Sequence, residues 1–290
     1  MVKEATKSLV DADWLESQLG ADDLLVFDTT VYMSRTAEGQ IDVQSGADRW
    51  AQGHIPTSGH LDLVGELSDT NSELWFTAPQ PDDLVAALMA RGIGDDTRVV
   101  LYDSQLHMWA TRAWWLMRSV GFTNVAILDG GLHGWSAQGR PVDDEPEPDR
   151  APVSLTVGQG MGGFTTKDVV KLAVSNDSVC VLNALSADNH AGLDMESGSG
   201  YGRPGHIPGA ANVPAQSLVD TESHRYRPLD ELREQFAAAG ALDGRVITYC
   251  GGGIAATSDA FVLHLLGQNE VAVYDGSLRE WIDAGEPLET

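Results

Sequence analysis

Two segments of this 290-residue chain occur twice. The tetrapeptide Gly-His-Ile-Pro occupies Gly53–Pro56 and returns at Gly205–Pro208. The segment Leu128–Trp135 (LDGGLHGW) returns as Tyr274–Trp281 (YDGSLREW) near the end of the chain. Motifs that recur in the same order indicate a duplicated unit, and each copy has the length of one ordinary domain. We therefore expect two domains of the same fold, over residues 1–140 and 153–290.

Residues 141–152 separate the two copies. The stretch reads PVDDEPEPDRAP, in which prolines and acidic residues dominate. Proline cannot continue a helix, and the segment has little apolar surface to bury. We expect an acidic, proline-rich linker at this position.

Each copy alternates short apolar runs with stretches of helical periodicity. The expected strands are 24–27, 98–102 and 125–128 in the first copy and 179–182, 245–249 and 271–274 in the second. The expected helices are 11–19, 164–174 and the segments that end at Gly121 and Gly267. This alternation predicts the α/β class, with a parallel sheet flanked by helices on both faces in each domain. Ligands of such folds bind beyond the carboxyl ends of the strands.

The charge balance restricts the partners of the chain. Lysine and arginine number 18 against 43 aspartate and glutamate residues, which gives a formal net charge of −25. A surface of this sign repels nucleic acid and anionic membranes, so neither is an expected partner. The sequence also has no apolar run long enough to span a bilayer and no apolar core of a secretion signal near its start. We expect a cytoplasmic protein.

The two cysteines occupy different settings. Cys180 lies between two valines of an expected strand, which predicts a small core residue. Cys250 follows the strand ending in Tyr249, at the position where the first copy has Asp103. Two cysteines cannot form a disulfide framework, and they are too few for a structural zinc site. We therefore expect no metal, and Cys250 requires another explanation.

A run of glycines follows Cys250 and leads into a helical pattern. Glycine permits left-handed backbone conformations, so that consecutive N–H groups of such a loop can turn inward and bind an anion. The following helix adds the positive end of its dipole. Because this environment stabilises a thiolate, the sequence predicts that Cys250 is a reactive nucleophile.

Taken together, these segments resemble the tandem-domain sulfurtransferases of the rhodanese superfamily, which include thiosulfate and 3-mercaptopyruvate sulfurtransferases. The resemblance spans nearly the whole chain and rests on Gly205–Pro214 (GHIPGAANVP), on the repeated segments that end in tryptophan, and on Tyr249–Gly253 (YCGGG). It implies two rhodanese folds with an active site at their interface. It also implies that the catalytic cysteine lies in the second domain and that the first domain, with Asp103 at the cysteine position, is catalytically inactive.

The resemblance further implies a double-displacement mechanism. The Cys250 thiolate would take a sulfane sulfur from a small anionic donor, thiosulfate or 3-mercaptopyruvate, and become a persulfide. The persulfide would then pass its sulfur to a thiophilic acceptor, which is cyanide, a small thiol or a protein thiol. No metal or other cofactor takes part. The backbone amides expected to cradle the persulfide belong to Gly251, Gly252, Gly253, Ile254 and Ala255.

Substrate recognition departs from the family pattern. Relatives carry arginines between the strand end and the second Gly-His-Ile-Pro motif, whereas residues 183–191 read NALSADNHA. Arg203 is a candidate to clamp a carboxylate or sulfonate, and a solvated loop arginine is an equal alternative. His190 is a second candidate donor, although a structural role is the stronger expectation for it. His54 is a third, because its counterpart reaches the interface in mercaptopyruvate enzymes.

Two other functions compete with sulfur transfer from a small donor. Dual-specificity phosphatases share this fold and a loop-bound thiolate, but they require an arginine six residues after the cysteine, where this chain has Ala256. A phosphatase is therefore disfavoured. A persulfide-relay or protein-binding module without efficient small-molecule turnover stays open, because the family's substrate arginines are missing.

Overall fold

The computed structural model describes residues 7–36, 41–148, 150–151, 153–158, 160, 162–193 and 203–290. Among these residues, no helix has the length and apolar character needed to cross a membrane. The chain divides into two compact units, and each is described by itself.

The first half of the chain builds a five-stranded parallel sheet in the order β1-β7-β6-β2-β5. Its strands are β1 (Leu9–Val10), β2 (Leu24–Asp28), β5 (Gly59–His60), β6 (Arg98–Tyr102) and β7 (Val125–Leu128). Its helices are α1 (Ala12–Gln18), α2 (Ala47–Trp50), α3 (Pro81–Ala90), α4 (Met108–Ser119) and α5 (Gly131–Ala137). A separate antiparallel hairpin pairs β3 (Val31–Arg35) with β4 (Ile41–Ser45).

The second half repeats this topology in a parallel sheet of order β10-β9-β11-β12-β8. Its strands are β8 (Phe164–Thr165), β9 (Val179–Asn183), β10 (Ala211–Asn212), β11 (Arg245–Tyr249) and β12 (Val271–Tyr274). Its helices are α6 (Lys167–Ala173), α7 (Ala187–His190), the 3₁₀ helix η2 (Ala215–Leu218), α8 (Leu229–Ala238), α9 (Ala256–Leu265) and α10 (Ser277–Asp283).

The predicted fold class is confirmed, and two local expectations need correction. The stretch 164–174 is not one helix, because Phe164 and Thr165 pair with β12 as an edge strand before α6 begins. The β3–β4 hairpin, which follows the expected strand 24–27, was not expected. Both differences come from pairing with a distant or neighbouring strand, which local periodicity does not report.

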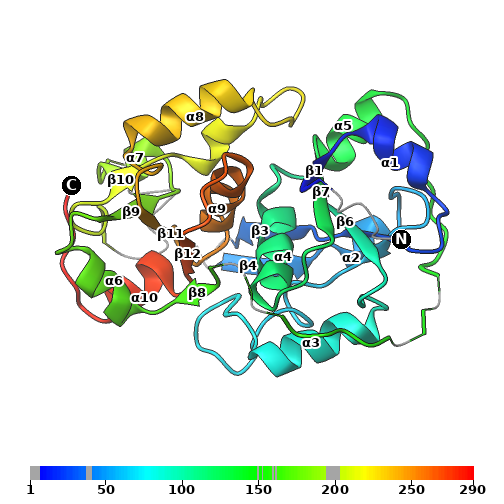
Figure 1. Cartoon of the computed structure of the whole chain (residues 1–290), viewed down its shortest axis with the longest axis horizontal. Helices are drawn as coiled ribbons and strands as arrows, with labels where there is room; N and C mark the ends of the chain where they lie inside the picture. The colour runs from blue at the N-terminus through cyan, green and yellow to red at the C-terminus, as the bar shows by residue number, and fades with distance from the viewer. Residues whose placement is uncertain are drawn as a thin grey trace. The chain divides into compact units, whose positions relative to one another are not determined.

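Helices cover both faces of each sheet (Figure 1). In the first half, one face packs Tyr102 and Val100 against Leu15 of α1 and Trp135 of α5. The other face carries α4, which packs on β6 and β7. Its tryptophans belong to the core: Trp109, Trp114 and Trp115 are all buried.

The second half has the same layers. One face packs Ile247 and Tyr249 of β11 against Val170 of α6 and Trp281 of α10. The opposite face carries α9, which packs on β11 and β12 and is itself covered by α8 (Figure 1). The central strand β11 is therefore buried on both faces.

The two compact units exchange short segments. One unit comprises the described residues of Met1–Asp69 and Pro79–Gly160 together with Asp220–Tyr226, and the other includes Thr70–Ala78. Within the first unit, Tyr226 N donates to Asp129 Oδ1 at 2.9 Å. Within the second, Ala78 N donates to Asp275 Oδ2 at 2.8 Å. Asp129 and Asp275 hold the same place in the repeated segment, so each copy receives a backbone donor from a distant part of the chain.

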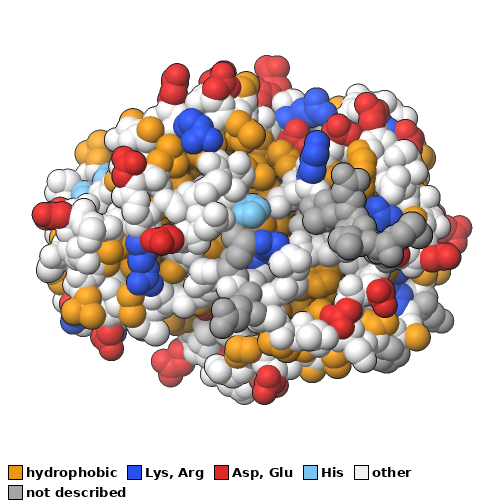
Figure 2. Space-filling view, in the orientation of Figure 1, with side chains coloured by type: hydrophobic (Ala, Val, Ile, Leu, Met, Phe, Trp, Pro, Cys, Tyr) orange, Lys and Arg blue, Asp and Glu red, His pale blue; other side chains and the backbone are white. Residues whose placement is uncertain are grey.

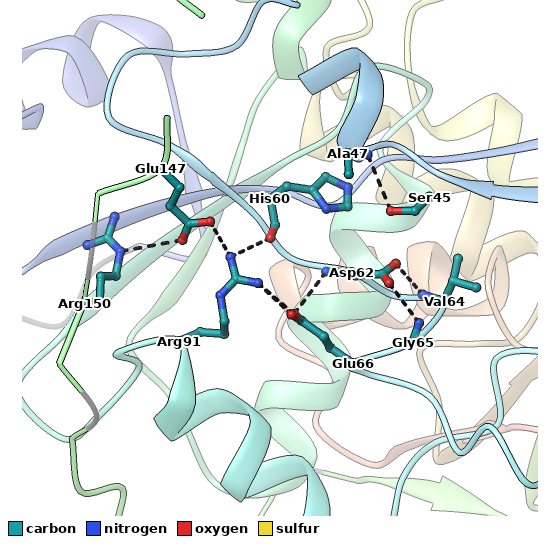
Figure 3. Close-up of polar contacts among 10 residues, drawn as sticks. All are labelled: Ser45, Ala47, His60, Asp62, Val64, Gly65, Glu66, Arg91, Glu147 and Arg150. Atoms are coloured by element: carbon teal, nitrogen blue, oxygen red, sulfur yellow. Dashed lines mark hydrogen bonds and ion pairs between the residues drawn. The ribbon is translucent and has the colours of Figure 1, made fainter. Parts of the chain in front are cut away.

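The segment expected to be a linker is fastened to the first unit by polar contacts (Figure 3). Arg91 donates from Nη2 to Glu147 Oε2 at 2.6 Å and to His60 O at 2.6 Å. Its Nη1 donates to both carboxylate oxygens of Glu66, at 2.8 and 2.9 Å. The backbones of Asp143 and His54 also bond to each other in both directions. The acidic residues thus give the segment a defined path that its lack of apolar side chains would not provide.

Acidic side chains are dispersed over the surface, as Figure 2 shows for one face. Lysine and arginine side chains are fewer on this face, and they lie among acidic, polar and apolar groups. The dispersed carboxylates favour solvation of this face. The basic side chains drawn on it form no extended patch.

Candidate active site

Cys250 lies directly after β11, at the carboxyl edge of the second parallel sheet. Only 3% of its surface is exposed. The helix α9 begins six residues further on at Ala256, and it runs for 10 residues. The thiol therefore sits between the end of a central strand and the positive end of a helix.

The loop after Cys250 presents unpaired backbone donors. The N–H groups of Gly251, Gly252, Ile254 and Ala255 have no hydrogen-bond acceptor in the described part of the chain. Gly253 adopts the left-handed conformation with φ +79°, which turns the loop. No side chain caps the start of α9. Backbone donors without an acceptor among the described residues, next to a helix N-terminus, favour a negatively charged group beside the thiol.

The opposite side of the loop is fixed by α10. Leu278 N donates to Cys250 O, and Arg279 N donates to Gly251 O, both at 3.0 Å. The carbonyl groups of Cys250 and Gly251 are thus turned toward α10. The loop N–H groups stay available on the other side of the peptide planes.

Ser277 also holds the backbone of Cys250. Its hydroxyl accepts from Cys250 N at 3.1 Å and donates to Tyr274 O at 2.7 Å. Ser277 is fully buried and adopts φ +50°, a conformation that favours glycine. The first copy has Gly131 at this place, with φ +53°. The sequence contained this signal as a Gly-to-Ser difference between the repeats, but it was not interpreted as functional.

Each Gly-His-Ile-Pro motif is hydrogen-bonded to the tyrosine that ends the central strand of its copy. Ile207 N donates to the Tyr249 hydroxyl at 3.0 Å, and Ile55 N donates to the Tyr102 hydroxyl at 3.3 Å. Burial raises the pKa of Tyr249, so its hydroxyl keeps its proton. The motif therefore fixes a turn next to Tyr249, the residue that directly precedes Cys250.

His190 forms part of a stacked pair with His206. The rings lie 3.7 Å apart at an interplanar angle of 15°. His206 Nδ1 lies 2.7 Å from His190 O, and Asn183 Nδ2 lies 3.1 Å from His190 Nδ1. Burial, followed by the neighbouring His206, lowers the pKa of His190 to about 4. His190 is therefore neutral at pH 7, and it brings no positive charge to an anion.

His54 has the same construction in the first unit. Its ring stacks on Trp50 at 4.2 Å, and Nδ1 lies 2.8 Å from Trp50 O. Its Nε2 lies 3.0 Å from Asp143 Oδ1. Both ring nitrogens are thus engaged within the unit, and the ring is 1% exposed. Trp50 and His190 end the equivalent helices α2 and α7, and each stacks on the histidine of its Gly-His-Ile-Pro motif.

Arg203 is exposed and bonds to the end of the chain. Its Nη1 donates to Glu286 O at 3.1 Å. Two residues N-terminal to it, Tyr201 and Gly202, lie outside the described residues. The structure brings Arg203 together with the C-terminal segment that also pairs with His206 through Glu289.

Cys180 differs from Cys250 in its environment. It is half-buried on β9, and its Sγ lies 3.5 Å from Ala239 O. Burial, followed by the nearby Asp259, raises the pKa of the Cys180 thiol to about 11. Cys180 therefore stays a thiol at pH 7, which is consistent with a packing role and not with a nucleophile.

Comparison with known proteins gives a consistent result. The rhodanese-like domain family matches residues 11–138 and 180–284. Thiosulfate/3-mercaptopyruvate sulfurtransferase 2 of Arabidopsis thaliana is 32% identical over 95% of this chain and 84% of its own length. The 3-mercaptopyruvate sulfurtransferase of Escherichia coli K12 is 31% identical over 96% of this chain and 95% of its own.

A solved structure agrees with these matches. The crystal structure of SseA from Escherichia coli, a 3-mercaptopyruvate sulfotransferase with the rhodanese fold, superposes with a TM-score of 0.77. It is 29% identical, and the superposition covers 94% of this chain and 99% of SseA. The repeated sheets, the matched domains and the full-length relatives lead to one conclusion: the chain belongs to the rhodanese family and carries two rhodanese-like domains.

Proposed function

We propose that this protein is a sulfurtransferase that moves a sulfane sulfur through a persulfide on Cys250. The observation that carries the proposal is the position of Cys250 beside the N–H groups of Gly251, Gly252, Ile254 and Ala255, which have no acceptor among the described residues. A persulfide adds a second, negatively charged sulfur to the cysteine. Backbone donors of this kind stabilise such a charge without a side-chain base.

The first displacement charges the enzyme. The Cys250 thiolate attacks the outer sulfur of thiosulfate, a new S–S bond forms, and the bond to the sulfite group breaks. Sulfite leaves with the electron pair of that bond. With 3-mercaptopyruvate, the C–S bond breaks instead, and the carbon takes up a proton as pyruvate leaves.

The second displacement discharges it. A nucleophile such as cyanide or a thiol attacks the terminal sulfur, and the electron pair of the S–S bond returns to Cys250 as the thiolate. Cyanide yields thiocyanate. The first unit has Asp103 at the place of the cysteine and cannot form a persulfide there, so we assign the chemistry to the second unit.

A relay of sulfur to a protein thiol is the second candidate. At the end of β9, Asn183 and His190 bond to each other, and His190 is uncharged at pH 7. A small dianionic donor gains little attraction from such groups. A protein partner would supply its own contacts over a wider surface.

Thiocyanate release tests the proposal. Purified protein is incubated with cyanide and either thiosulfate or 3-mercaptopyruvate, and the two rates are compared. We expect Cys250→Ser to abolish turnover while the far-UV circular dichroism stays unchanged. Cys180→Ser is the matched control and should keep full activity.

Each outcome has a defined meaning. Undiminished turnover by Cys250→Ser would contradict the proposal. No turnover with either small donor, together with persulfide formation from a cysteine desulfurase, would favour the relay.

A further inference from the structure

A segment of the first copy, Thr70–Ala78, belongs to the compact unit that contains Cys250. It lies between β5 and α3 in the sequence, and we call it the crossing segment. Its last residue donates from Ala78 N to Asp275 Oδ2 at 2.8 Å, although the two residues are 197 positions apart. The unit that carries Cys250 therefore includes a piece of the first copy.

The second copy has a matching segment, Asp220–Tyr226, which belongs to the other unit. Its last residue donates from Tyr226 N to Asp129 Oδ1 at 2.9 Å. Each of the two donors precedes the next helix, α3 or α8, by three residues. Both acceptors are the aspartate of the repeated segment that ends in tryptophan. The duplication has thus kept the same bond in both units.

The backbone of the two segments also has the same unusual shape. Phe76 has φ +59° and His224 has φ +57°, and each lies two residues before the donor. Positive φ is uncommon for residues other than glycine and is costly for bulky ones. The same costly conformation at the same place in both copies indicates that the fold requires the N–H group in this position.

Asp275 lies next to the residues that hold the loop after Cys250. It is followed by Gly276 and then by Ser277, whose hydroxyl accepts from Cys250 N at 3.1 Å. The next two residues, Leu278 and Arg279, donate from their backbones to carbonyl groups of the loop. The bond from the crossing segment therefore fixes the chain directly before three residues that fix the loop.

The first copy has the bond without this last connection. Asp129 accepts from Tyr226 N, but the residue two positions after Asp129 is Gly131, where the second copy has Ser277. Glycine has no hydroxyl that could accept from the loop backbone. The side-chain bond from this place to the residue at the cysteine position belongs to the second copy, which has the thiol.

We propose that Asp275 is a positioning residue for Cys250, through which the crossing segment of the first copy holds the loop in the conformation that stabilises a thiolate. The inference rests on the proposed function, because it says how the loop that binds the persulfide is kept in place. Without the bond to Ala78, the start of α10 is less fixed and the N–H groups beside Cys250 are no longer held at the sulfur. The negative charge on the sulfur then loses stabilisation.

Alkylation of Cys250 by iodoacetamide tests the proposal without any sulfur transfer. All proteins are full-length and carry Cys180→Ser, so that Cys250 is the single thiol. Asp275→Ala deletes the acceptor, and we expect alkylation at pH 7 to slow by roughly 10-fold because less thiolate is present. At pH 10, above the value of about 8.5 at which a free thiol ionises, both proteins hold mostly thiolate, and the rate should change by less than about twofold.

Three further variants serve as controls. Asp275→Asn keeps an oxygen that can accept from Ala78 N, so it should alkylate like the parent protein. Asp129→Ala breaks the equivalent bond in the other unit and should leave both rates unchanged. Ala78→Pro removes the donor instead of the acceptor, because proline has no N–H group, and it should behave like Asp275→Ala. Circular dichroism checks the fold of each variant.

Equal slowing at pH 7 and pH 10 in Asp275→Ala would overturn the proposal, because it would show a change in access and not in thiolate stabilisation. Equal effects of Asp275→Ala and Asp129→Ala would overturn it as well. If Asp275→Ala does not fold, the comparison of Ala78→Pro with Ala78→Gly, which keeps the N–H group, decides in the same way.

Thiocyanate release by the same proteins separates this inference from the proposed function. A parent protein without turnover would contradict the proposed function and leave the alkylation result standing. Turnover by the parent protein, together with unchanged alkylation of Asp275→Ala at pH 7, would contradict only the role of Asp275.

Discussion

Ser277 combines a strained backbone with a hydroxyl bonded to Cys250. A non-glycine residue with φ +50° costs about 1–3 kcal/mol, which the surrounding structure must offset. The first copy avoids this strain with Gly131. The hydroxyl is therefore the reason we infer for a serine at this position, and it acts by positioning Cys250.

Removal of the hydroxyl should slow sulfur transfer more than it weakens folding. We expect Ser277→Ala to lower kcat by roughly 10- to 100-fold, because the Cys250 N–H loses its acceptor and the loop shifts. The KM for the donor should change little. Ser277→Gly removes the same hydroxyl but relieves the strain, so it should be as slow as Ser277→Ala and more stable in thermal unfolding. Full activity in both variants would contradict the positioning role.

Asp28 gives the first unit a dependence on pH. Burial raises the pKa of its carboxyl to about 7, the hydrogen bonds from Thr30 oppose this, and the neighbouring Asp103 adds to it. The folded protein then holds a proton that the unfolded chain releases above about pH 4. Stability from this group is therefore full at low pH and is lost as the pH rises from about 4 to about 7.

Asp28→Asn should remove the loss of stability that Asp28 causes as the pH rises. The amide stays neutral, and its oxygen can still accept from Thr30 N, as Asp28 Oδ1 does at 2.7 Å. We expect the free energy of unfolding at pH 8 to rise by about 1–4 kcal/mol, with a smaller change at pH 4. Urea unfolding at pH 4 and pH 8 measures this free energy, and Asp22→Asn, at an exposed carboxylate, is the control. Equal shifts at both pH values would show that Asp28 does not titrate there.

The roles of single residues could be predicted from the sequence where the repeat allowed equivalent positions of the two copies to be compared. Cys250 and Asp103 stood out because two aligned strand ends carried different side chains. The engagement of His190 by Asn183 and His206 could not be predicted, because those side chains are brought together by folding and not by spacing.

The segment between the two copies follows a defined path that polar contacts hold on the first unit. Arg91 follows the last residue of α3, and its guanidinium joins Glu66, Glu147 and the carbonyl of His60 (Figure 3). The Arg91 and Glu147 side chains are 19% and 24% exposed, so water screens their attraction only in part. This cluster keeps the segment on the first unit.

Glu147→Gln should loosen the segment. We expect a loss of about 1–3 kcal/mol in the free energy of unfolding, since Arg91 would keep a partly buried charge with one carboxylate fewer to neutralise it. Trypsin should cleave the native protein faster after Arg150. Glu145→Gln removes the same charge from an exposed residue of the same segment and should leave both readouts unchanged. Identical behaviour of the two variants would contradict the role of the cluster.

The strands were predicted well because fully buried parallel strands read as short apolar runs. The expected strand 245–249 is β11, and the expected strand 98–102 is β6. The pairing of Phe164 with β12 was missed because a two-residue edge strand leaves no pattern in the sequence. The path of residues 141–148 was missed because ion pairs, unlike apolar faces, have no periodicity.

For the whole molecule, the duplication explains both the fold and the division of roles. Two copies with the same sheet order present the same strand end and loop. One loop holds its own carboxylate, and the other leaves its amides beside a cysteine. The exchange of Thr70–Ala78 and Asp220–Tyr226 was not predictable, because no motif marks a segment that joins the other copy's unit.

The central claim is that Cys250 carries the transferred sulfur, and peptide mass spectrometry tests it most directly. The protein is charged without acceptor by thiosulfate, by 3-mercaptopyruvate, or by a cysteine desulfurase with cysteine, and is then digested with trypsin. Cleavage after Arg245 and Arg279 places Cys250 on Val246–Arg279, apart from Cys180. We predict one added sulfur atom on that peptide with at least one of these sources, and none on the Cys180 peptide. An unmodified Cys250 with all three sources, or equal labelling of Cys180, would contradict the account.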